Sequence, residues 1–262
     1  MNILVTNDDG LHMPGIWAMV KALKEVGTVT VIAPDREQSG VGAGVTLMHP
    51  VRVSEAVPRI KGVRTLAAEG TPADCVVLAM QGLAPQPIDL VVSGINEGAN
   101  IGIYVTMSGT VGAAVQAHLW NVPAIAVSVS SLKGCIFQPA AKMAGLLAKM
   151  FQDGTLSGPM LLNVNLPNQP QKNIEGVMVT SLARGKFSEK LIKADMPKHD
   201  YYFIARGDTE WEEEEGTDVW AIRRKRISIT PLHMELTSDV ITPMLAECAP
   251  TIFQEFQKEP RK

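Results

Sequence analysis

The feature that most constrains the fold is a strand–helix–strand pattern within about the first 33 residues. Residues 3–6 and 29–33 are apolar runs of strand length, Pro14 suits the first turn of a helix, and Gly27 can end it. Two strands joined by a helix pair in parallel with a right-handed crossover, so this pattern predicts an α/β protein. The apolar residues between them recur at helical spacing: Ile16, Met19, Val20 and Leu23.

The first strand ends in an abrupt change to polar residues, Asn7-Asp8-Asp9-Gly10. In an open α/β sheet, ligands bind beyond the carboxyl ends of the strands, so the two carboxylates are expected at the rim of that crevice. Adjacent anions raise each other's pKa unless a cation lies between them. Hard oxygen ligands of this kind suit magnesium, manganese or calcium. The alternative is a surface turn, for which Asp-Asp-Gly is equally suitable.

The alternation of strands and helices continues to about residue 167. Strands are expected at 89–93, 123–128 and 160–166, and helices after Thr71-Pro72 and over 140–151. Ser108-Gly109-Thr110 begins another helix, and backbone N–H groups with neighbouring hydroxyls at a helix start favour an anion. The alternative is that small residues there only allow a helix to pack closely on the sheet.

Composition limits the class of protein. The chain has 262 residues, of which 46% are hydrophobic and 19% charged, as in a globular protein with a large core. With 24 basic and 27 acidic residues the net charge is −3, which gives no support for binding a nucleic-acid polymer. The 3 cysteines form no CxxC pair. The chain shows neither a signal peptide nor a membrane span, so we expect a soluble cytoplasmic protein.

The C-terminal part, from about residue 168, no longer supplies regular strand–helix units. A tail over 241–256 is expected to be an amphipathic helix. Apolar faces on a short strand and a terminal helix need a partner surface, so at least a dimer is predicted. The alternative is that this region folds back on its own sheet. The apolar residues concerned are Ile227, Ile229, Leu232, Ile241, Leu245, Ile252, Phe253 and Phe256.

Several short motifs occur together in an order that resembles the SurE (survival protein E) family over nearly the full length of the chain. No single motif is decisive, but their number and order make coincidence remote. The motifs are Asn7-Asp8-Asp9-Gly10; Pro34-Asp35-Arg36 with Ser39-Gly40; Gly70-Thr71-Pro72 with Asp74-Cys75-Val76; Ser93-Gly94-Ile95-Asn96 with Gly98 and Asn100; Ser108-Gly109-Thr110-Val111; Leu162-Asn163-Val164-Asn165-Leu166-Pro167; Gly216-Thr217-Asp218; and Ser228-Ile229-Thr230-Pro231-Leu232.

The resemblance implies a single domain over residues 1–262. It would comprise a Rossmann-like, three-layer αβα core (about 1–167) and a C-terminal extension (about 168–262) that exchanges between subunits. It also implies a metal-dependent 5′-nucleotidase, a phosphoric monoester hydrolase acting on nucleoside 5′- and 3′-monophosphates and in some members on short polyphosphate. No nucleic-acid polymer or membrane is implied as a partner, and the expected assembly is a homodimer or homotetramer.

By matching position, one divalent ion (Mg²⁺ or Mn²⁺) per subunit would be held by Asp8, Asp9, Ser39 and Asn96. Catalytic roles fall to Asp8, Asp9 and Asn7, while the phosphate would contact Asn7, Asn96, Ser108, Gly109 and Thr110. One carboxylate could instead be the general base, and no residue is assigned to protonate the leaving group.

The chain also departs from the family pattern, and other classes of protein compete with this interpretation. Relatives carry a tyrosine where this chain has Met107, and Tyr104, one turn away, is a candidate to replace it. A receiver-like domain would need an aspartate where Asn96 stands, and a phosphatase with an Asp-x-Asp nucleophile would not have its two acids adjacent. A non-catalytic module that binds nucleotide or phosphate remains the alternative.

Overall fold

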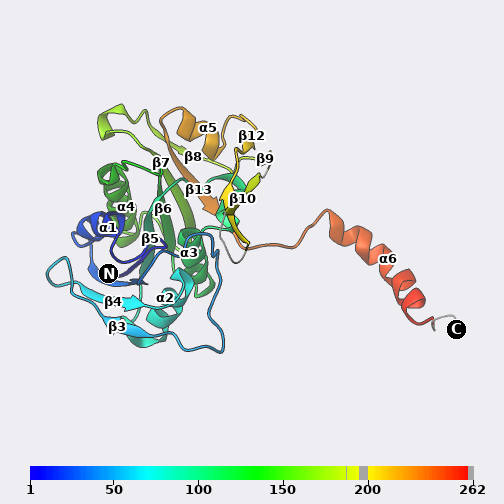
Figure 1. Ribbon diagram of the computed structural model, residues 1–262, viewed down its shortest axis with the longest axis horizontal. Coiled ribbons are helices and arrows are strands. Elements are labelled where there is room, and N and C mark those ends of the chain that lie inside the picture. Colours follow the sequence, from blue (N-terminus) through cyan, green and yellow to red (C-terminus); the bar gives the residue numbers. More distant parts are fainter. Residues whose placement is uncertain (187, 195–199, 259–262) are drawn as a thin grey trace. The chain divides into compact units, whose positions relative to one another are not determined.

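The structure is a computed structural model that describes residues 1–186, 188–194 and 200–258. The chain divides into two compact units, Met1–Leu232 and His233–Lys262. In the first unit, nine strands form one sheet in the order β3-β4-β2-β1-β5-β6-β7-β13-β8 (Figure 1). The division after Leu232 differs from the division near residue 167 that the sequence suggested, since two later strands belong to the main sheet.

The middle of the sheet is parallel, which confirms the predicted α/β fold. Strand β1 lies between β2 and β5, and β4, β6 and β7 extend the parallel arrangement on the two sides. Strands β3 and β13 run antiparallel to their neighbours β4 and β7. The bounds are β1 Asn2–Thr6, β2 Thr28–Pro34, β3 Val53–Glu55, β4 Arg64–Ala68, β5 Leu90–Glu97, β6 Ala124–Ser130, β7 Leu161–Pro167, β8 Val177–Val179 and β13 Ile227–Leu232.

Side chains of the central strand point alternately to two helical layers, as the two-residue period of a strand requires. Ile3 and Val5 lie in a core cluster with residues of α1 (Pro14–Leu23) and α4 (Phe137–Gln152). Leu4 lies in a second cluster with residues of α2 (Pro72–Leu78) and α3 (Gly109–Leu119). The result is a three-layer αβα unit, with one helix pair on each side of the sheet (Figure 1).

The predicted start of α2 is confirmed in detail. The Thr71 hydroxyl accepts a hydrogen bond from the Asp74 backbone N–H, and the Asp74 carboxylate accepts one from the Thr71 N–H. This reciprocal pair is a capping box, and Pro72 follows it where no N–H is needed. Asp74 also accepts two bonds from Thr46, so the same carboxylate fixes the loop that follows β2.

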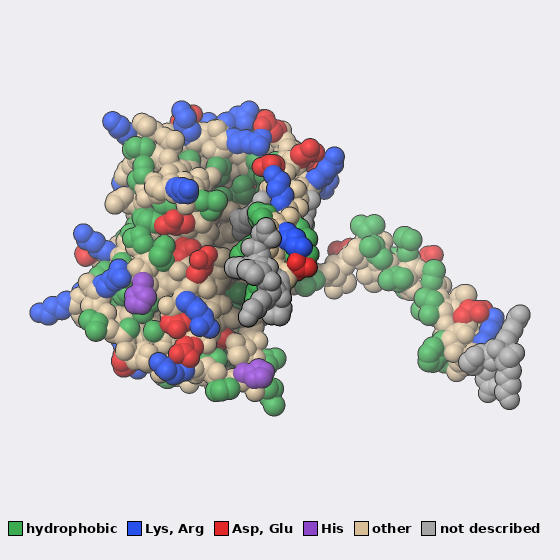
Figure 2. Space-filling model, viewed as in Figure 1, with side chains coloured by type: hydrophobic (Ala, Val, Ile, Leu, Met, Phe, Trp, Pro, Cys, Tyr) green, Lys and Arg blue, Asp and Glu red, His purple; other side chains and the backbone are tan. Residues whose placement is uncertain are grey.

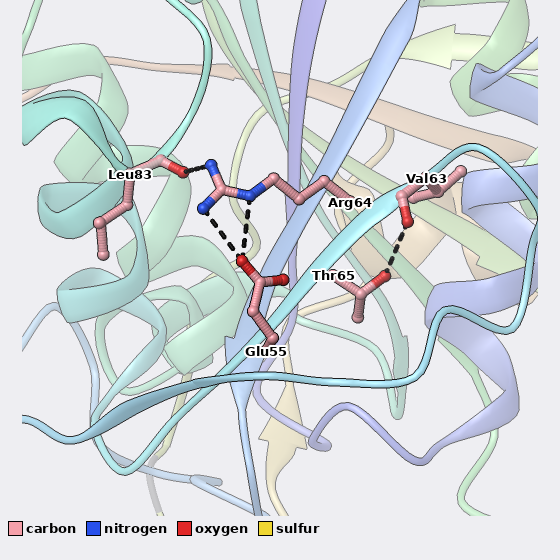
Figure 3. A network of polar contacts seen from close by, with 5 residues as sticks. All are labelled: Glu55, Val63, Arg64, Thr65 and Leu83. Atoms are coloured by element: carbon pink, nitrogen blue, oxygen red, sulfur yellow. Dashed lines mark hydrogen bonds and ion pairs between the residues drawn. The ribbon is translucent and has the colours of Figure 1, made fainter.

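At the edge of the sheet, a polar cluster ties the β3–β4 hairpin to the segment after α2 (Figure 3). Arg64 in β4 donates to the Glu55 carboxylate at 3.2 Å and to the Leu83 carbonyl oxygen at 2.8 Å. Leu83 ends η1 (Ala79–Leu83), a short π-helical turn that continues α2. These groups are exposed, so we expect the cluster to order the edge without adding much stability.

The expectation that the strand near residue 227 needs a partner surface is wrong. Strand β13 pairs antiparallel with β7 and parallel with β8, and Ile227 is buried in the core. It is followed by no further strand of this sheet in the described chain. The remaining elements of the C-terminal region are η3 (Gln171–Asn173), β9 (Gly185–Lys186), β10 (Glu189–Ala194), β11 (Tyr201–Arg206), β12 (Glu210–Trp211) and α5 (Asp218–Arg223), with β10 pairing β11 and β9 pairing β12.

The second unit contains the predicted terminal helix, α6 (Ile241–Phe256). All its residues are exposed, including Leu245 and Phe253. Figure 2 shows hydrophobic side chains along much of its length. Among the described residues, no helix combines the length and the apolar character needed to cross a membrane.

Candidate active site

The polar carboxyl ends of β1 and β5 lie side by side where the order of strand connections reverses direction across the sheet. From β1 the connections run first toward β2 and β4, and β5 then pairs with β1 on its other side. This is the topological switch point at which open α/β sheets form a crevice. Asp8 and Asp9 follow β1, and Asn96 lies near the end of β5. The sheet therefore brings together residues almost ninety positions apart.

A cavity of about 570 Å³ opens at this point. It collects five of the residues proposed from the sequence: Asp8, Asp9, Ser39, Asn96 and Ser108. The other described residues that line it are Met13, Glu37, Gly40, Glu97, Asn100 and Leu132.

Three further predicted residues lie behind the cavity wall and do not line it: Asn7, Gly109 and Thr110. Asn7 is buried and donates from Nδ2 to the Gly10 carbonyl oxygen at 2.9 Å, which fixes the turn after β1. The Thr110 hydroxyl is also buried and donates to Asp8 Oδ1. In this arrangement Asn7 and Thr110 orient the acidic pair.

Burial makes the two carboxylates costly to ionise. Only 3% of Asp8 is exposed, and burial raises the pKa of its carboxyl against the opposing effect of hydrogen bonds from Thr110. The pKa of Asp9 is raised to about 7, first by burial and then by the charge of Asp8. No lysine, arginine or histidine is among the described residues of the lining. The described lining thus holds the two acids together without a cationic side chain.

The Asn96 amide has a fixed orientation. Its Nδ2 donates to the Gly98 carbonyl oxygen at 2.7 Å, which leaves Oδ1 available as an acceptor. The register between β5 and β6 shifts between Gly94 and Asn96. Gly94 has φ +131°, and a Cβ there would lie 2.3 Å from the Val127 carbonyl oxygen, so only glycine fits this bend. The glycine of the Ser93-Gly94-Ile95-Asn96 motif therefore shapes the strand end that carries Asn96.

The start of α3 lies directly against Asp8. Ser108 is the N-cap residue, and its hydroxyl accepts from the Val111 N–H at 3.1 Å. A Cβ on Gly109 would lie 2.8 Å from the Asp8 Cβ, which explains glycine at this position. The contact gives Gly109 a packing role, while Ser108 reaches the cavity.

The loop after β2 is held over the same cavity. The Gln38 backbone N–H donates to the Asp8 carbonyl oxygen at 2.7 Å. The Ser39 hydroxyl donates to Glu37 Oε1 at 2.8 Å, so the lone pairs of the Ser39 oxygen remain free to accept. Four side chains thus offer oxygen ligands around one cavity: Asp8 and Asp9 from the loop after β1, Ser39 from the loop after β2 and Asn96 from the end of β5. Within the described chain, no three His, Cys, Asp or Glu side chains form a metal-binding group by themselves, so Ser39 and Asn96 would be needed to complete a site.

A buried amide network was not predicted from the sequence. The Asn100 N–H donates to Asn165 Oδ1 at 2.8 Å, and its carbonyl oxygen accepts from the amides of Asn163 and Asn165. Asn100 Nδ2 donates to the Ser128 hydroxyl. The network anchors the segment between β5 and α3 on β6 and β7. The available signal was the spacing of Asn163 and Asn165, since alternate residues of a buried strand share one face.

Glu37 and Glu97 were also missed as cavity residues. Glu97 ends β5, and its backbone N–H donates to Asp9 Oδ2 at 3.2 Å. In the sequence, each is an acidic residue within two positions of a proposed metal ligand. Acidic residues are too common on protein surfaces for this spacing alone to predict a site residue.

Tyr104, the candidate to replace the family tyrosine, is held by a ring contact and a hydrogen bond. Its ring is buried edge-on against Trp211, with centroids 5.6 Å apart, and its hydroxyl shares a hydrogen bond with Thr209. Tyr104 is absent from the cavity lining. It joins the short helix η2 (Gly102–Thr106) to the β9–β12 pair, and its replacement of the family tyrosine at position 107 stays a prediction.

Comparison with known proteins identifies the family of this chain. The family model described as Survival protein SurE matches residues 3–189. A Geobacter sulfurreducens protein named 5′-nucleotidase SurE is 45% identical over 240 residues, which cover 91% of this chain and 90% of that protein. A Dehalococcoides mccartyi protein (strain CBDB1) of the same name is 44% identical over 238 residues, or 90% of each.

A solved structure gives the same result for the fold. The crystal structure of the SurE protein from Aquifex aeolicus superposes with a TM-score of 0.80 at 36% identity, and the match covers 95% of this chain and 100% of that one. The resemblance seen in the sequence motifs is thereby confirmed, and the chain belongs to the SurE family.

Proposed function

We propose that the chain is a metal-dependent 5′-nucleotidase that hydrolyses nucleoside 5′- and 3′-monophosphates to nucleoside and phosphate, and that accepts short polyphosphate as a second substrate. The observation that carries this proposal is the adjacent pair of buried Asp8 and half-buried Asp9 in a cavity lined by oxygen donors. The names of the Geobacter and Dehalococcoides relatives support the nucleotidase activity.

The donor set fits a hard divalent cation. Asp8, Asp9, Ser39 and Asn96 would hold one Mg²⁺ or Mn²⁺ per subunit, since these ions prefer carboxylate, hydroxyl and amide oxygens. The raised pKa of Asp9, about 7 without a cation, is the expected mark of a site that is completed by positive charge. When bound, such an ion polarises a phosphoryl oxygen and lowers the pKa of a coordinated water.

The residues of the chain supply binding and orientation. The Ser108 hydroxyl lies at the start of α3, where N–H groups and the helix dipole favour an anion such as phosphate. Asn96 reaches the same cavity, while Asn7, Gly109 and Thr110 act through the placement of Asp8 and the turns around it. The carboxylate of the pair that does not hold the cation, Asp8 or Asp9, would be the candidate general base for the attacking water.

The first prediction tests the metal site. Asp8→Asn and Asp9→Asn should each lower kcat/KM for a nucleoside 5′-monophosphate by about 100-fold or more, as loss of a direct ligand should cost at least as much as loss of its supporting groups. Titration calorimetry with Mn²⁺ should show the matching loss of affinity. Asp239→Asn, an exposed acid outside the cavity, is the control. If a chelator did not reduce phosphate release from a panel of nucleotides, the proposed metal dependence would be contradicted. If the unchanged protein released no phosphate at all, the alternative of a non-catalytic phosphate-binding module would be favoured.

The second prediction concerns pH and the metal-free protein. The folded pKa of Asp9, about 7, lies above its ordinary value of 3.8. Between these values the folded chain keeps a proton that the unfolded chain releases, so stability falls as the pH rises through this window. Asp9→Asn removes this cost and should raise Tm in chelator by about 3–6 °C at pH 8, with little change at pH 4. Calorimetry at both pH values measures it, and an equal gain at pH 4 and pH 8 would show that ionisation of Asp9 is not the cause.

The third prediction tests the phosphate contact. Ser108→Ala should raise KM for the nucleotide and the Ki of inorganic phosphate about fivefold, the worth of one hydrogen bond. The substitution also removes the N-cap of α3, so Thr217→Ala, which removes the N-cap of α5 away from the cavity, is the matched control. A similar change in Ki for both variants would reduce Ser108 to a capping residue.

The chain is further proposed to form a homodimer, or a homotetramer built from such dimers, through exchange of α6. The apolar residues of this helix recur three, four or seven positions apart, which places them on one face, and they are exposed, as on a helix that docks on a partner. Exchange of a terminal element is a low-cost route to a symmetric assembly. The residues are Ile241, Met244, Leu245, Ile252, Phe253 and Phe256.

The fourth prediction follows from this exchange. The full chain should scatter light as a dimer or tetramer at micromolar concentration, and the double variant Leu245→Glu, Phe253→Glu should be a monomer. Burying two unpaired charges in an interface costs more than a typical dimer can tolerate. Gln254→Glu, on the polar side of the helix, should keep the wild-type mass. A monomeric wild type, or a double variant of unchanged mass, would exclude exchange through α6.

A further inference from the structure

We propose that Glu97 is a specificity-determining residue that disfavours phosphate substrates carrying negative charge beyond a single phosphate group. The inference depends on the proposed hydrolysis of phosphate esters and deepens it. It assigns nucleoside monophosphates as preferred substrates and short polyphosphate as a poor one, and it attributes the preference to one side chain.

Glu97 is held close to the reacting end of the site. As the last residue of β5 it follows Asn96 directly, and its backbone N–H donates to Asp9 Oδ2 at 3.2 Å. Its side chain is half-buried and lines the same cavity as Asp8, Asp9 and Ser108. The Glu97 side chain thus shares the cavity with the proposed metal and phosphate ligands.

The charge of Glu97 is not compensated by the protein. The described lining holds four carboxylates, those of Asp8, Asp9, Glu37 and Glu97, and no lysine, arginine or histidine. In the described ranges, no ion pair joins Glu97 to a basic side chain. One divalent cation would neutralise no more than half of these four charges. Phosphate sites commonly use arginine or lysine, so a lining of this sign is unusual and calls for a function.

Extra charge on a substrate would meet this carboxylate. In a nucleoside monophosphate the group beyond the reacting phosphate is an uncharged sugar. In polyphosphate the next group is another anion, only a few ångströms from the reacting phosphorus and inside the same cavity. Because the Glu97 carboxylate lines the same cavity, like-charge repulsion then lowers binding of the second substrate relative to the first.

Glu97 is a better candidate than Glu37 for this role. The Glu37 carboxylate accepts a hydrogen bond from the Ser39 hydroxyl, so its removal would also disturb a proposed metal ligand. No side-chain hydrogen bond of Glu97 is seen in the described part of the chain. A substitution of Glu97 by glutamine therefore removes its charge without breaking a hydrogen bond.

The experiment compares kcat/KM for tripolyphosphate with kcat/KM for a nucleoside 5′-monophosphate at one free Mn²⁺ concentration. Glu97→Gln should raise this ratio about three- to fivefold, since it removes one repulsive charge and keeps the shape. Glu97→Asp keeps the charge and should stay near the wild-type ratio. Glu25→Gln makes the same change in net charge at an exposed position outside the cavity and should leave the ratio unchanged. Chelation of Mn²⁺ by tripolyphosphate cancels, because every variant receives the same solutions.

Salt distinguishes a charge effect from a change of shape. The difference between wild type and Glu97→Gln should shrink as ionic strength rises from about 0.05 to 1 M, because the screening length falls to about 3 Å. Glu97→Ser provides a second neutral variant if Glu97→Gln does not fold. If tripolyphosphate is hydrolysed too slowly to measure, its Ki against the nucleotide replaces kcat/KM.

The outcomes separate the two proposals. If the wild type releases no phosphate from any nucleotide, the proposed function fails. If the nucleotide is hydrolysed but neither neutral Glu97 variant changes the ratio, the role of Glu97 is overturned and the nucleotidase stands. An equal rise in Glu25→Gln, or a rise that persists in high salt, also overturns it, because the cause is then not the local charge.

Discussion

The rest of the site depends on two adjacent carboxylates held at the end of the central strand. Asp8 is buried and Asp9 has a pKa raised to about 7, so together they destabilise the fold unless charge is supplied from outside. Neighbouring residues reduce this destabilisation. Thr110 donates to Asp8, the Glu97 backbone N–H donates to Asp9, and Gly109 permits the close approach of α3. Stability has been given up locally to keep a charged pair where a ligand can use it.

The sheet converts this local pair into a site. Because β1 is flanked by β2 and β5, the loops after all three strands meet at one edge. Gln38 bonds to the Asp8 carbonyl oxygen, and the Gly42 N–H bonds to the Met107 carbonyl oxygen just before the α3 turn. The Asn100 network fixes the remaining segment on β6 and β7. The strands thereby position the candidate ligands at their ends, which gives the site a defined geometry.

The fold and much of the site could be predicted because strand ends carry local signals. Apolar runs that end in Asn-Asp-Asp-Gly or Ser-Gly-Ile-Asn give both a strand and its functional edge, and Thr71-Pro72-Ala73-Asp74 gives a helix start. Long-range features carried no such signal. The docking of β13 on β7, the burial of Tyr104 against Trp211 and the entry of Glu97 into the cavity depend on which segments meet in space. Roles of Asn7 and Thr110 were similarly ambiguous, since a polar residue beside a ligand and one that orients the ligand look alike in sequence.

The negative charge of the cavity lining affects how a metal ion and phosphate would bind. Four carboxylates without a basic side chain in the described lining repel phosphate, so attraction has to come from the α3 N-terminus and from a bound cation. If Asp8 and Asp9 hold that cation as proposed, the cation increases the affinity for phosphate, and by linkage phosphate increases the affinity for the cation by the same factor. A basic residue in the wall would weaken this coupling, because phosphate could then bind a site that lacks its metal. With the proposed metal bound by Asp8 and Asp9, the acidic wall would therefore make phosphate binding conditional on that metal.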